Sequence, residues 1–395
     1  MDENQLRLLL TPEGFEAVAT ARDLPLDSVR EAGRAVQLLR ARGYSPELTA
    51  VALTQAQLAR RGREKFGDVA ASRLYTDAGL QQATRMRIAA VHAARYRYAG
   101  ATEVVDLCCG MGADSLAFAA AGMTVTAIER DPVTAAIATY NLAPFPHTSV
   151  VLKDAQSVSL PAQAAIWADP ARRSDAGRSY DPDDFTPPVD WVYSLAETHA
   201  VGMKLGPGHP HDQIPAECEA QWVSDHGVAR ELGLWFGPLA RPGRRFSALV
   251  LTDDAAHEID GDEHDPAVPT AALDRYLYDP DPAVIRARAL GELSARLQAH
   301  TISPGIAYLS SAQCTSTPFA DVFAVDEVLP FDRRRLRQLV HQRNIGSLEI
   351  KKRGADVDPA VLRRELHLHG DEHATLFVTR IAGRHRAIVA HRVTP

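Results

Sequence analysis

From residue 103 onward, short apolar runs alternate with longer stretches whose apolar residues recur at helical spacing. The strand-like runs are residues 103–109, 124–130, 149–154, 164–170 and 200–205. Helical patterns over residues 114–122 and 133–143 follow the first two runs. Parallel strands need a crossover of a dozen or more residues, and helices of this length supply it. The alternation therefore predicts an α/β fold with a doubly wound, Rossmann-like parallel sheet.

Residues 1–95 have a different pattern, with helical spacing throughout and no strand-like run. Helices are expected over residues 27–43, 45–62 and 79–97. The first would begin at a capping Asp27, and the second at Ser45 followed by a proline at the first helical position. We therefore expect an N-terminal helical domain over residues 1–95, before an α/β domain over residues 96–255.

Beyond residue 230 we expect the last strands of the α/β domain, then a connecting segment and a small C-terminal domain. Two strands are expected at 231–240 and 244–254 around a turn, then an acidic loop to 270, and one long helix over 279–300. Residues 256–322 are accordingly expected to be a linker with a helix. The final part, 323–395, is expected to be a small α+β domain with helices over 333–344 and 359–370, a strand over 347–354, and a hairpin over 375–393 that turns at Gly383.

Charge is distributed unevenly along the chain. Residues 331–395 hold 14 Lys and Arg against 7 Asp and Glu, a net charge of +7, whereas the whole chain carries −7, so the rest carries −14. A basic segment on an acidic body favours an anionic partner, above all a nucleic acid, over a merely well-solvated surface.

Other features narrow the class of protein. The chain is 46% hydrophobic and 24% charged, as in a water-soluble globular protein. No apolar run approaches the roughly 20 residues that span a bilayer, and no signal peptide is recognisable, so we expect no membrane association. The four cysteines form no CxxC pair, which argues against a metal site or a disulfide framework and favours the cytoplasm.

The first strand ends at Asp106 and leads into a turn with Gly110 and Gly112 before the next helix. Glycines here let the backbone turn tightly and approach a ligand closely. The second strand ends in Glu129, an acid placed to accept both hydroxyl hydrogens of a ribose. A dinucleotide-binding turn would need Gly or Ala where this chain has Ser115, which disfavours a nicotinamide cofactor.

This segment resembles motif I of class I S-adenosylmethionine-dependent methyltransferases. The resemblance implies a Rossmann-like methyltransferase sheet and a site for S-adenosylmethionine. The residues that it assigns to cofactor binding are Asp106, Cys108, Gly110, Gly112, Glu129, Arg130, Asp154 and Asp169. Asp154 ends the third strand, at the position that in the family contacts the adenine amino group. Read alone, any of these acids could be a helix cap or a solvated loop residue.

The fourth strand ends in Asp169 and Pro170, which resemble motif IV of methyltransferases that act on bases. A carboxylate and a proline-directed carbonyl that accept N–H bonds would orient the lone pair of an acceptor nitrogen, so these two residues are the expected catalytic residues. The sequence departs from the usual motif, because Ala171 replaces a second proline and Arg172 replaces the aromatic residue that stacks on a flipped base. Arg172 and Arg173 could instead hold a phosphate, or pair with nearby aspartates.

Residues 74–96 resemble the segment that precedes motif I and covers the cofactor in RNA methyltransferases of the guanine-N2 type. This likeness implies lid positions for Tyr75, Thr76 and Gln82, and substrate contacts for the first two; an ordinary amphipathic helix capped by Asp77 is the alternative. Cys218 could be a nucleophile of the kind that uracil-carbon methyltransferases use, but a buried structural thiol is the commoner case.

Residues 331–395 resemble the THUMP-like domain at the C-terminus of a group of bacterial methyltransferases, and residues 276–290 resemble their shared linker. THUMP domains bind RNA, chiefly transfer RNA. The combined resemblance implies a methyltransferase that acts on a base nitrogen of transfer or ribosomal RNA. Two alternatives stay open: a methyltransferase of a small molecule or protein, and a non-catalytic RNA-binding protein with an altered motif IV.

Overall fold

A computed structural model describes residues 1–172 and 184–393, with the backbone alone described at Arg172. The chain divides into two compact units. One comprises residues 1–204 with 235–240, and the other comprises 205–234 with the chain from 241 onward. Within the described ranges, no helix is both long and apolar enough to cross a membrane.

The first unit begins with helices alone, as the sequence predicts. They are α1 (Glu3–Leu9), α2 (Pro12–Arg22), α3 (Val29–Ala41), α4 (Pro46–Phe66), α5 (Asp77–Gln82) and α6 (Met86–Tyr98). Ser45 caps α4 through the N–H of Leu48, with Pro46 at the first position, as expected. The cap of α3 is Ser28 rather than Asp27, because the serine hydroxyl accepts from the N–H of Glu31. The helix expected over residues 79–97 is interrupted, so that α5 and α6 are separate.

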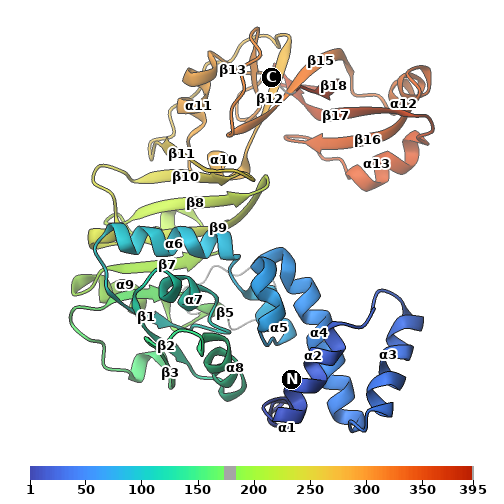
Figure 1. The fold of residues 1–395 in the computed structure, drawn as a ribbon. Helices are drawn as coiled ribbons and strands as arrows, with labels where there is room; N and C mark the ends of the chain where they lie inside the picture. Colours follow the sequence, from blue (N-terminus) through green and yellow to red (C-terminus); the bar gives the residue numbers. More distant parts are fainter. Residues whose placement is uncertain (173–183, 394–395) are drawn as a thin grey trace. The chain divides into compact units, whose positions relative to one another are not determined.

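A parallel sheet follows these helices and confirms the predicted α/β class (Figure 1). Its elements are β1 (Glu103–Leu107), α7 (Ala113–Ala120), β2 (Thr124–Glu129), α8 (Pro132–Leu142), β3 (Thr148–Leu152), β4 (Ala165–Ala168), α9 (Val189–Ser194) and β7 (Val201–Leu205). The strand order in this unit is β7-β4-β1-β2-β3, and every pairing recorded among these strands is parallel. A short antiparallel pair, β5 (Ala171–Arg172) and β6 (Phe185–Thr186), stands beside motif IV.

The strand order places the expected ligand crevice. From β1 the chain moves to β2 on one side, and β4 pairs with β1 on the other. Such a reversal is a topological switch point, and ligands of doubly wound sheets bind outside the carboxyl ends of the strands there. The segments that leave β1 and β4 begin at Cys108 and Asp169. The fold thus brings motif I and motif IV to the same edge of the sheet.

Helices α6 and α7 cover one face of this sheet. Tyr96 from α6 and Phe118 from α7 are fully buried against Trp167 of β4, and Val104 and Val125 complete the cluster. Trp167 therefore belongs to the core, so it offers no stacking surface to a substrate base.

In the second unit, four strands lie in the order β11-β10-β8-β9. They are β8 (Glu219–Asp225), β9 (Val228–Trp235), β10 (Phe246–Leu251) and β11 (Ala256–Gly261). The two expected strands, β9 and β10, exist, but they are not neighbours, because β8 lies between them. The acidic segment expected to be a loop contains β11, which pairs antiparallel with β10.

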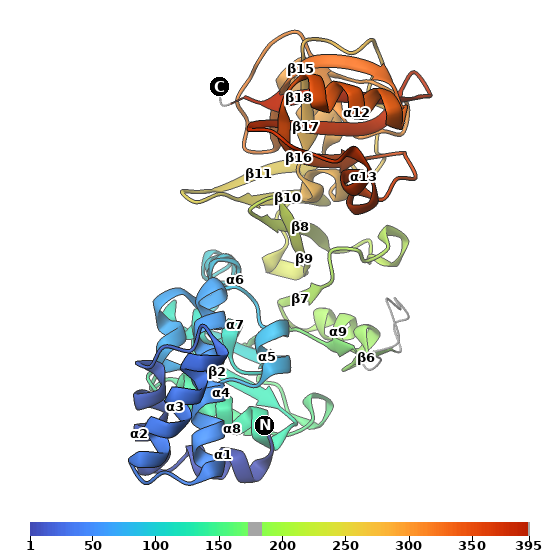
Figure 2. The same cartoon turned by 90° about the vertical axis from the view of Figure 1, so that its right-hand side faces the viewer.

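The C-terminal part is a sheet with the order β13-β14-β12-β15-β18-β17-β16. Its strands are β12 (Tyr276–Pro280), β13 (His300–Thr301), β14 (Leu309–Ser311), β15 (Ala320–Pro330), β16 (Ile345–Lys352), β17 (Glu372–Ile381) and β18 (Arg384–Arg392). Helices α12 (Arg333–Gln342) and α13 (Pro359–Leu366) lie over one face of it, as Figure 2 shows. The expected hairpin of β17 and β18 is present, with Gly383 at a φ of +76° in its turn.

The structure differs from the expected linker over residues 256–322. Strands β12, β13 and β14 from this segment belong to the same sheet as β15 to β18. The long helix expected there is two short ones, α10 (Pro282–Arg286) and α11 (Leu290–Leu297), because Arg288 adopts a φ of +56° that ends the first. The small domain is therefore built from more of the chain than residues 323–395.

Gly202 on β7 offers a test of this packing. A Cβ at Gly202 would lie 2.6 Å from the Tyr96 hydroxyl and 2.8 Å from the Trp235 ring. Gly202→Ala should therefore destabilise the protein by about 1–3 kcal/mol, because buried aromatic rings have no room to move. Thermal unfolding followed by circular dichroism measures the loss.

The same substitution at exposed Gly33 on α3 is the control, because a Cβ there meets nothing within 4 Å. Gly33→Ala should stabilise the helix by about 0.5–1 kcal/mol. If Gly202→Ala and the wild type have the same melting temperature, the aromatic cluster is not packed as described.

Candidate functional site

The loop between β1 and α7 turns through three residues in the left-handed region. Cys108 has a φ of +64°, Gly110 of +55° and Gly112 of +78°. A Cβ built on Gly110 meets no atom within 4 Å, so the space beside this backbone is open. A tight turn with an open glycine is what a closely bound ligand requires.

Cys108 is the non-glycine member of this set, and its left-handed backbone is costly for an L-residue. Its Sγ lies 3.8 Å from the carbonyl oxygen of Thr186. Burial raises the pKa of the Cys108 thiol far above its usual value, and the negative charges of Glu129 and Asp106 raise it further. The thiol is therefore neutral and is not a nucleophile.

Asp106, the last but one residue of β1, is 1% exposed. Its Oδ2 accepts a hydrogen bond from the Ser115 hydroxyl on α7, while its Oδ1 is buried with no hydrogen-bond partner. Burial raises the pKa of the Asp106 carboxyl well above its ordinary value, and the charge of Asp114 adds to the rise. A buried acid with an unsatisfied oxygen is a candidate contact for a positively charged ligand.

Glu129 at the end of β2 is fixed by backbone N–H donors. Its Oε2 accepts from Gly110 at 3.1 Å, and its Oε1 accepts from Arg130 and Asp131 at 2.8 Å each. Burial raises the pKa of Glu129 despite these bonds. A carboxylate has about four lone-pair positions, so capacity for a further donor remains. The bond to Gly110 places this acid directly at the glycine turn, whereas the Arg130 side chain is exposed.

Asp154 follows β3, the neighbour of β2 in the sheet. Its carboxylate is exposed and accepts from the N–H of Gln156 at 2.9 Å, where it caps the 3-10 turn Ala155–Ser157. The structure thus brings Asp106 and Glu129 to the glycine turn and places Asp154 one strand farther along the same edge. No contact joins the Asp154 side chain to the turn.

The segment before α5 packs on the motif I loop, at Met111. The N–H of Thr76 points to the Met111 sulfur at 3.3 Å, and the Met111 carbonyl accepts from Arg73 and Asn141 at 3.0 and 3.1 Å. This is the segment that the sequence analysis expected to cover the cofactor.

Tyr75 does not match that expectation. Its side chain is fully buried, and its hydroxyl donates to the carbonyl of Ala70. Apolar packing and this bond turn the ring into the core, so the side chain is not placed to contact a substrate. Thr76 caps α5 through the N–H of Gly79, and Gln82 is exposed at the end of that helix.

Asp169 and Pro170 follow β4. The N–H of Asp169 donates to the Leu107 carbonyl at 3.4 Å, which joins the ends of β4 and β1. About a third of the Asp169 side chain is exposed, whereas Pro170 is buried. The charge of Asp169 acts on both Asp106 and Cys108, so the acceptor motif and the glycine turn share one electrostatic environment.

Other expected site residues contribute less. The Arg172 backbone pairs with Phe185, and its side chain lies outside the described residues, as does the whole of Arg173. Cys218 is buried, and burial raises the pKa of its thiol to about 11, which fits a structural role. Over residues 1–172 and 184–393, no group of three or more His, Cys, Asp or Glu side chains could hold a metal ion.

Two site residues were missed by the sequence analysis. Lys204, at the end of β7, forms an ion pair with Asp169, and its Nζ also donates to the Thr84 hydroxyl at 3.0 Å. One signal was available for Lys204: it is a charged residue inside an otherwise apolar strand pattern. Nothing local marks Thr84, because its partners come from distant parts of the sequence.

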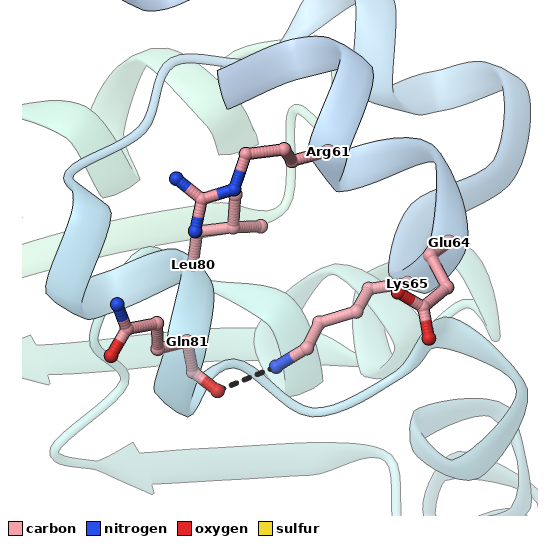
Figure 3. Close-up of a pocket in the computed structure, with 5 residues that line it drawn as sticks. All are labelled: Arg61, Glu64, Lys65, Leu80 and Gln81. Carbon is pink, nitrogen blue, oxygen red and sulfur yellow. Dashed lines mark hydrogen bonds between the residues drawn. The ribbon is translucent and has the colours of Figure 1, made fainter. Parts of the chain in front are cut away.

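A pocket of about 260 Å³ lies elsewhere in the first unit, between α4 and α5 (Figure 3). Its lining residues are Arg61, Glu64, Lys65, Leu80 and Gln81. The Lys65 ammonium donates to the Gln81 carbonyl at 2.7 Å, and Arg61 is paired with Asp77. None of the motif I or motif IV residues line this pocket, so it is separate from the site described above.

Comparison with known proteins identifies the family to which the chain belongs. Residues 320–392 match the family described as THUMP domain-like, and residues 2–62 match a domain of unknown function. An uncharacterised S-adenosylmethionine-dependent methyltransferase of Mycobacterium tuberculosis is 33% identical over 347 residues, which is 86% of this chain and 95% of that protein.

A solved structure agrees with the fold. The crystal structure of a protein described as a methyltransferase, from Porphyromonas gingivalis W83, superposes with a TM-score of 0.73 at 20% identity, and covers 96% of this chain and 99% of that one. The identity and coverage of the mycobacterial relative, together with the glycine turn and its acids, show the family. The chain is a class I S-adenosylmethionine-dependent methyltransferase with a C-terminal THUMP-like domain.

Proposed function

We propose that this enzyme transfers the methyl group of S-adenosylmethionine to a base nitrogen of RNA, either transfer or ribosomal RNA, in the cytoplasm. The observation that carries the proposal is the position of Asp169. This partly exposed carboxylate is joined through its backbone to the end of β1, within electrostatic reach of Asp106 and Cys108 in the glycine turn.

The residues of the turn fit the cofactor on two observations. Buried Asp106 has an oxygen without a partner, which the cationic amino group of the methionine moiety would satisfy. Gly110 borders open space, and Glu129 beside it would accept the ribose hydroxyls. Asp154, one strand farther, would meet the adenine amino group. When bound, S-adenosylmethionine supplies an electrophilic methyl group.

The acceptor would be positioned by Asp169 and Pro170. The carboxylate and the proline carbonyl would accept the N–H bonds of a base nitrogen, which turns the nitrogen lone pair toward the methyl carbon. Asp169 would then take the proton that the nitrogen loses after methylation. Trp167 is in the core, so stacking of a flipped base must come from another part of the protein.

Two features support RNA as the substrate. The THUMP-like family match covers residues 320–392, and residues 331–395 carry a net charge of +7. Arg334 and Arg335 on α12, Arg364 on α13 and Lys352 on β16 are exposed. Exposed basic side chains would contact RNA phosphates and give salt-dependent binding. All four cysteines are free, as expected of a protein in the reducing cytoplasm.

Asp106 gives the cofactor site a measurable signature. Burial raises the pKa of its carboxyl, and a cationic amino group bound beside it would lower that pKa again. Binding of S-adenosylhomocysteine, which carries the same amino group, should therefore be accompanied by proton release, and its affinity should fall as the pH drops. Calorimetry in buffers of different ionisation enthalpy measures this release.

The matched variants are Asp106→Asn, which should abolish proton release, and Asp154→Asn, which should retain it, because Asp154 is exposed. NAD should give no heat. Equal heats in all buffers for the wild type would contradict the assignment of Asp106.

Asp169→Ala tests the acceptor site. The substitution should lower incorporation of tritiated methyl groups into RNA at least about 100-fold, since it removes the orienting carboxylate. The affinity for S-adenosylhomocysteine should stay within about twofold, since the glycine turn is intact. The assay uses transfer and ribosomal RNA from a strain that lacks the gene, with Asp23→Ala, an exposed acid after α2, as the control.

The same assay separates the alternatives. If tritiated methyl groups appear in protein or in small molecules and none appear in RNA, the substrate is a protein or a small molecule and not RNA. A wild type that binds S-adenosylhomocysteine and RNA but labels no fraction would be a non-catalytic RNA-binding protein. Loss of cofactor affinity in Asp169→Ala would mean that the acceptor site is misplaced.

RNA binding by the basic domain is tested by charge removal. Filter binding of bulk transfer RNA at rising salt should give a steep loss of affinity for the wild type. The double variant Arg334→Gln with Arg335→Gln should reduce the slope of log affinity against log salt by up to about two, because each lost phosphate contact removes about one released counterion. Arg30→Gln with Arg34→Gln on α3 makes the same charge change at exposed positions and should leave the slope unchanged.

A further inference from the structure

A continuous line of polar side chains runs from the core of the first unit to the acceptor motif. The His92 Nδ1 lies 2.8 Å from Oδ1 of Asp114, and the Thr84 hydroxyl donates to the other oxygen of Asp114 at 2.7 Å. The Lys204 ammonium donates to the same Thr84 oxygen at 3.0 Å and pairs with Asp169. These contacts therefore join four segments that are distant in sequence: residues 84–92, Asp114, Asp169 and Lys204.

Burial falls steadily along this line. The side chain of His92 is 1% exposed, that of Asp114 7%, that of Lys204 13% and that of Asp169 32%. Buried polar and charged groups are costly unless hydrogen bonds satisfy them, and here each is joined to the next. The His92 ring also packs at a tilt against the Trp167 ring, with ring centroids 4.4 Å apart, so the inner end of the line lies in the aromatic core.

Lys204 lies between two carboxylates on this line. Burial acts to raise the pKa of Asp114, but the hydrogen bond with His92 and the electrostatic effects of His92 and Lys204 outweigh it, so the pKa lies below its ordinary value. Asp114 is therefore an anion near neutral pH. The Lys204 ammonium thus has one anion beside it, Asp169, and a second, Asp114, across the Thr84 hydroxyl.

We propose that Lys204 is a positioning residue for methyl transfer, held by Thr84 and Asp114, and that it fixes the orientation of the Asp169 carboxylate. The inference rests on the proposed function, in which Asp169 accepts the N–H of the acceptor nitrogen. Lys204 binds Oδ2 of Asp169, which restricts the rotation of this carboxylate. Lys204 itself forms and breaks no covalent bond.

The physical reason is the exposure of Asp169. A carboxylate that is a third exposed could rotate and bind water, and a misplacement of about 1 Å can cost about 100-fold in rate. The Lys204 ammonium donates to the Thr84 hydroxyl, which in turn donates to buried Asp114. Because these bonds fix the ammonium, it can hold the Asp169 carboxylate in place. Lys204 lies near the end of strand β7, and its side chain places a compact positive charge beside Asp169.

Three variants test this arrangement: Lys204→Met, Lys204→Arg and Thr84→Val. With labelling of transfer RNA from a strain that lacks the gene, Lys204→Met should lower kcat about 100-fold, while KM for S-adenosylmethionine and the melting temperature stay near wild type. Lys204→Arg should have a kcat about tenfold higher than that of Lys204→Met, because arginine keeps the positive charge. Thr84→Val, which preserves shape, should lower kcat about tenfold.

A readout independent of RNA accompanies the kinetics. In crystal structures with S-adenosylhomocysteine, the Asp169 carboxylate should hold one orientation in the wild type and turn away from it in Lys204→Met. If wild-type enzyme labels no RNA, the proposed function fails, and this comparison alone decides the role of Lys204.

Three results would overturn the inference. One is an unchanged Asp169 carboxylate in the Lys204→Met crystal. Another is a wild-type kcat in that variant alongside an active wild-type enzyme. The third is an equal fall of kcat, cofactor affinity and melting temperature in Lys204→Met and Lys204→Arg, which would show that Lys204 serves folding alone.

Discussion

The carboxyl group of Asp106 is the constraint around which the first unit is arranged. It is placed where water cannot reach it, at the end of a strand with parallel neighbours on both sides. One of its oxygens accepts a hydrogen bond from Ser115. The other is buried without a partner, and the free-energy cost of burying it is offset only if a cation binds. The left-handed turn after it is held by the hydrogen bond between Glu129 and Gly110, and we propose that this turn binds the adenosine of that cation.

The elements that sequence reasoning located correctly are those set by local pattern. Strands β1 to β4, the glycine turn and the N-cap of α4 follow from apolar spacing and from residues with special capping or backbone properties. The direction of a side chain is set by tertiary packing, which is why Tyr75 was assigned to a surface that it does not reach. Lys204 and Thr84 were missed for the same reason, since their partners are distant in sequence.

The C-terminal sheet shows where pattern reasoning fails over longer distances. Strands β13 and β14 have two and three residues, too short for an alternation to be visible. Arg288 interrupts a helical pattern although no proline or glycine in the sequence predicts a break there. Both faces of the sheet are nevertheless covered: Leu376 and Val378 lie toward α12 and α13, while Phe377 lies in a second cluster with Tyr308.

The pairing of β12 with β15 has a practical consequence for dissecting the molecule. A fragment that starts at the family boundary near residue 320 would lose β12, and with it the backbone partners of Val322 and Phe323. The N–H and C=O groups of β15 would then form an open edge, the kind of surface on which chains join into aggregates. A separately expressed C-terminal domain should therefore begin before Tyr276, so that β15 keeps β12 as its partner strand.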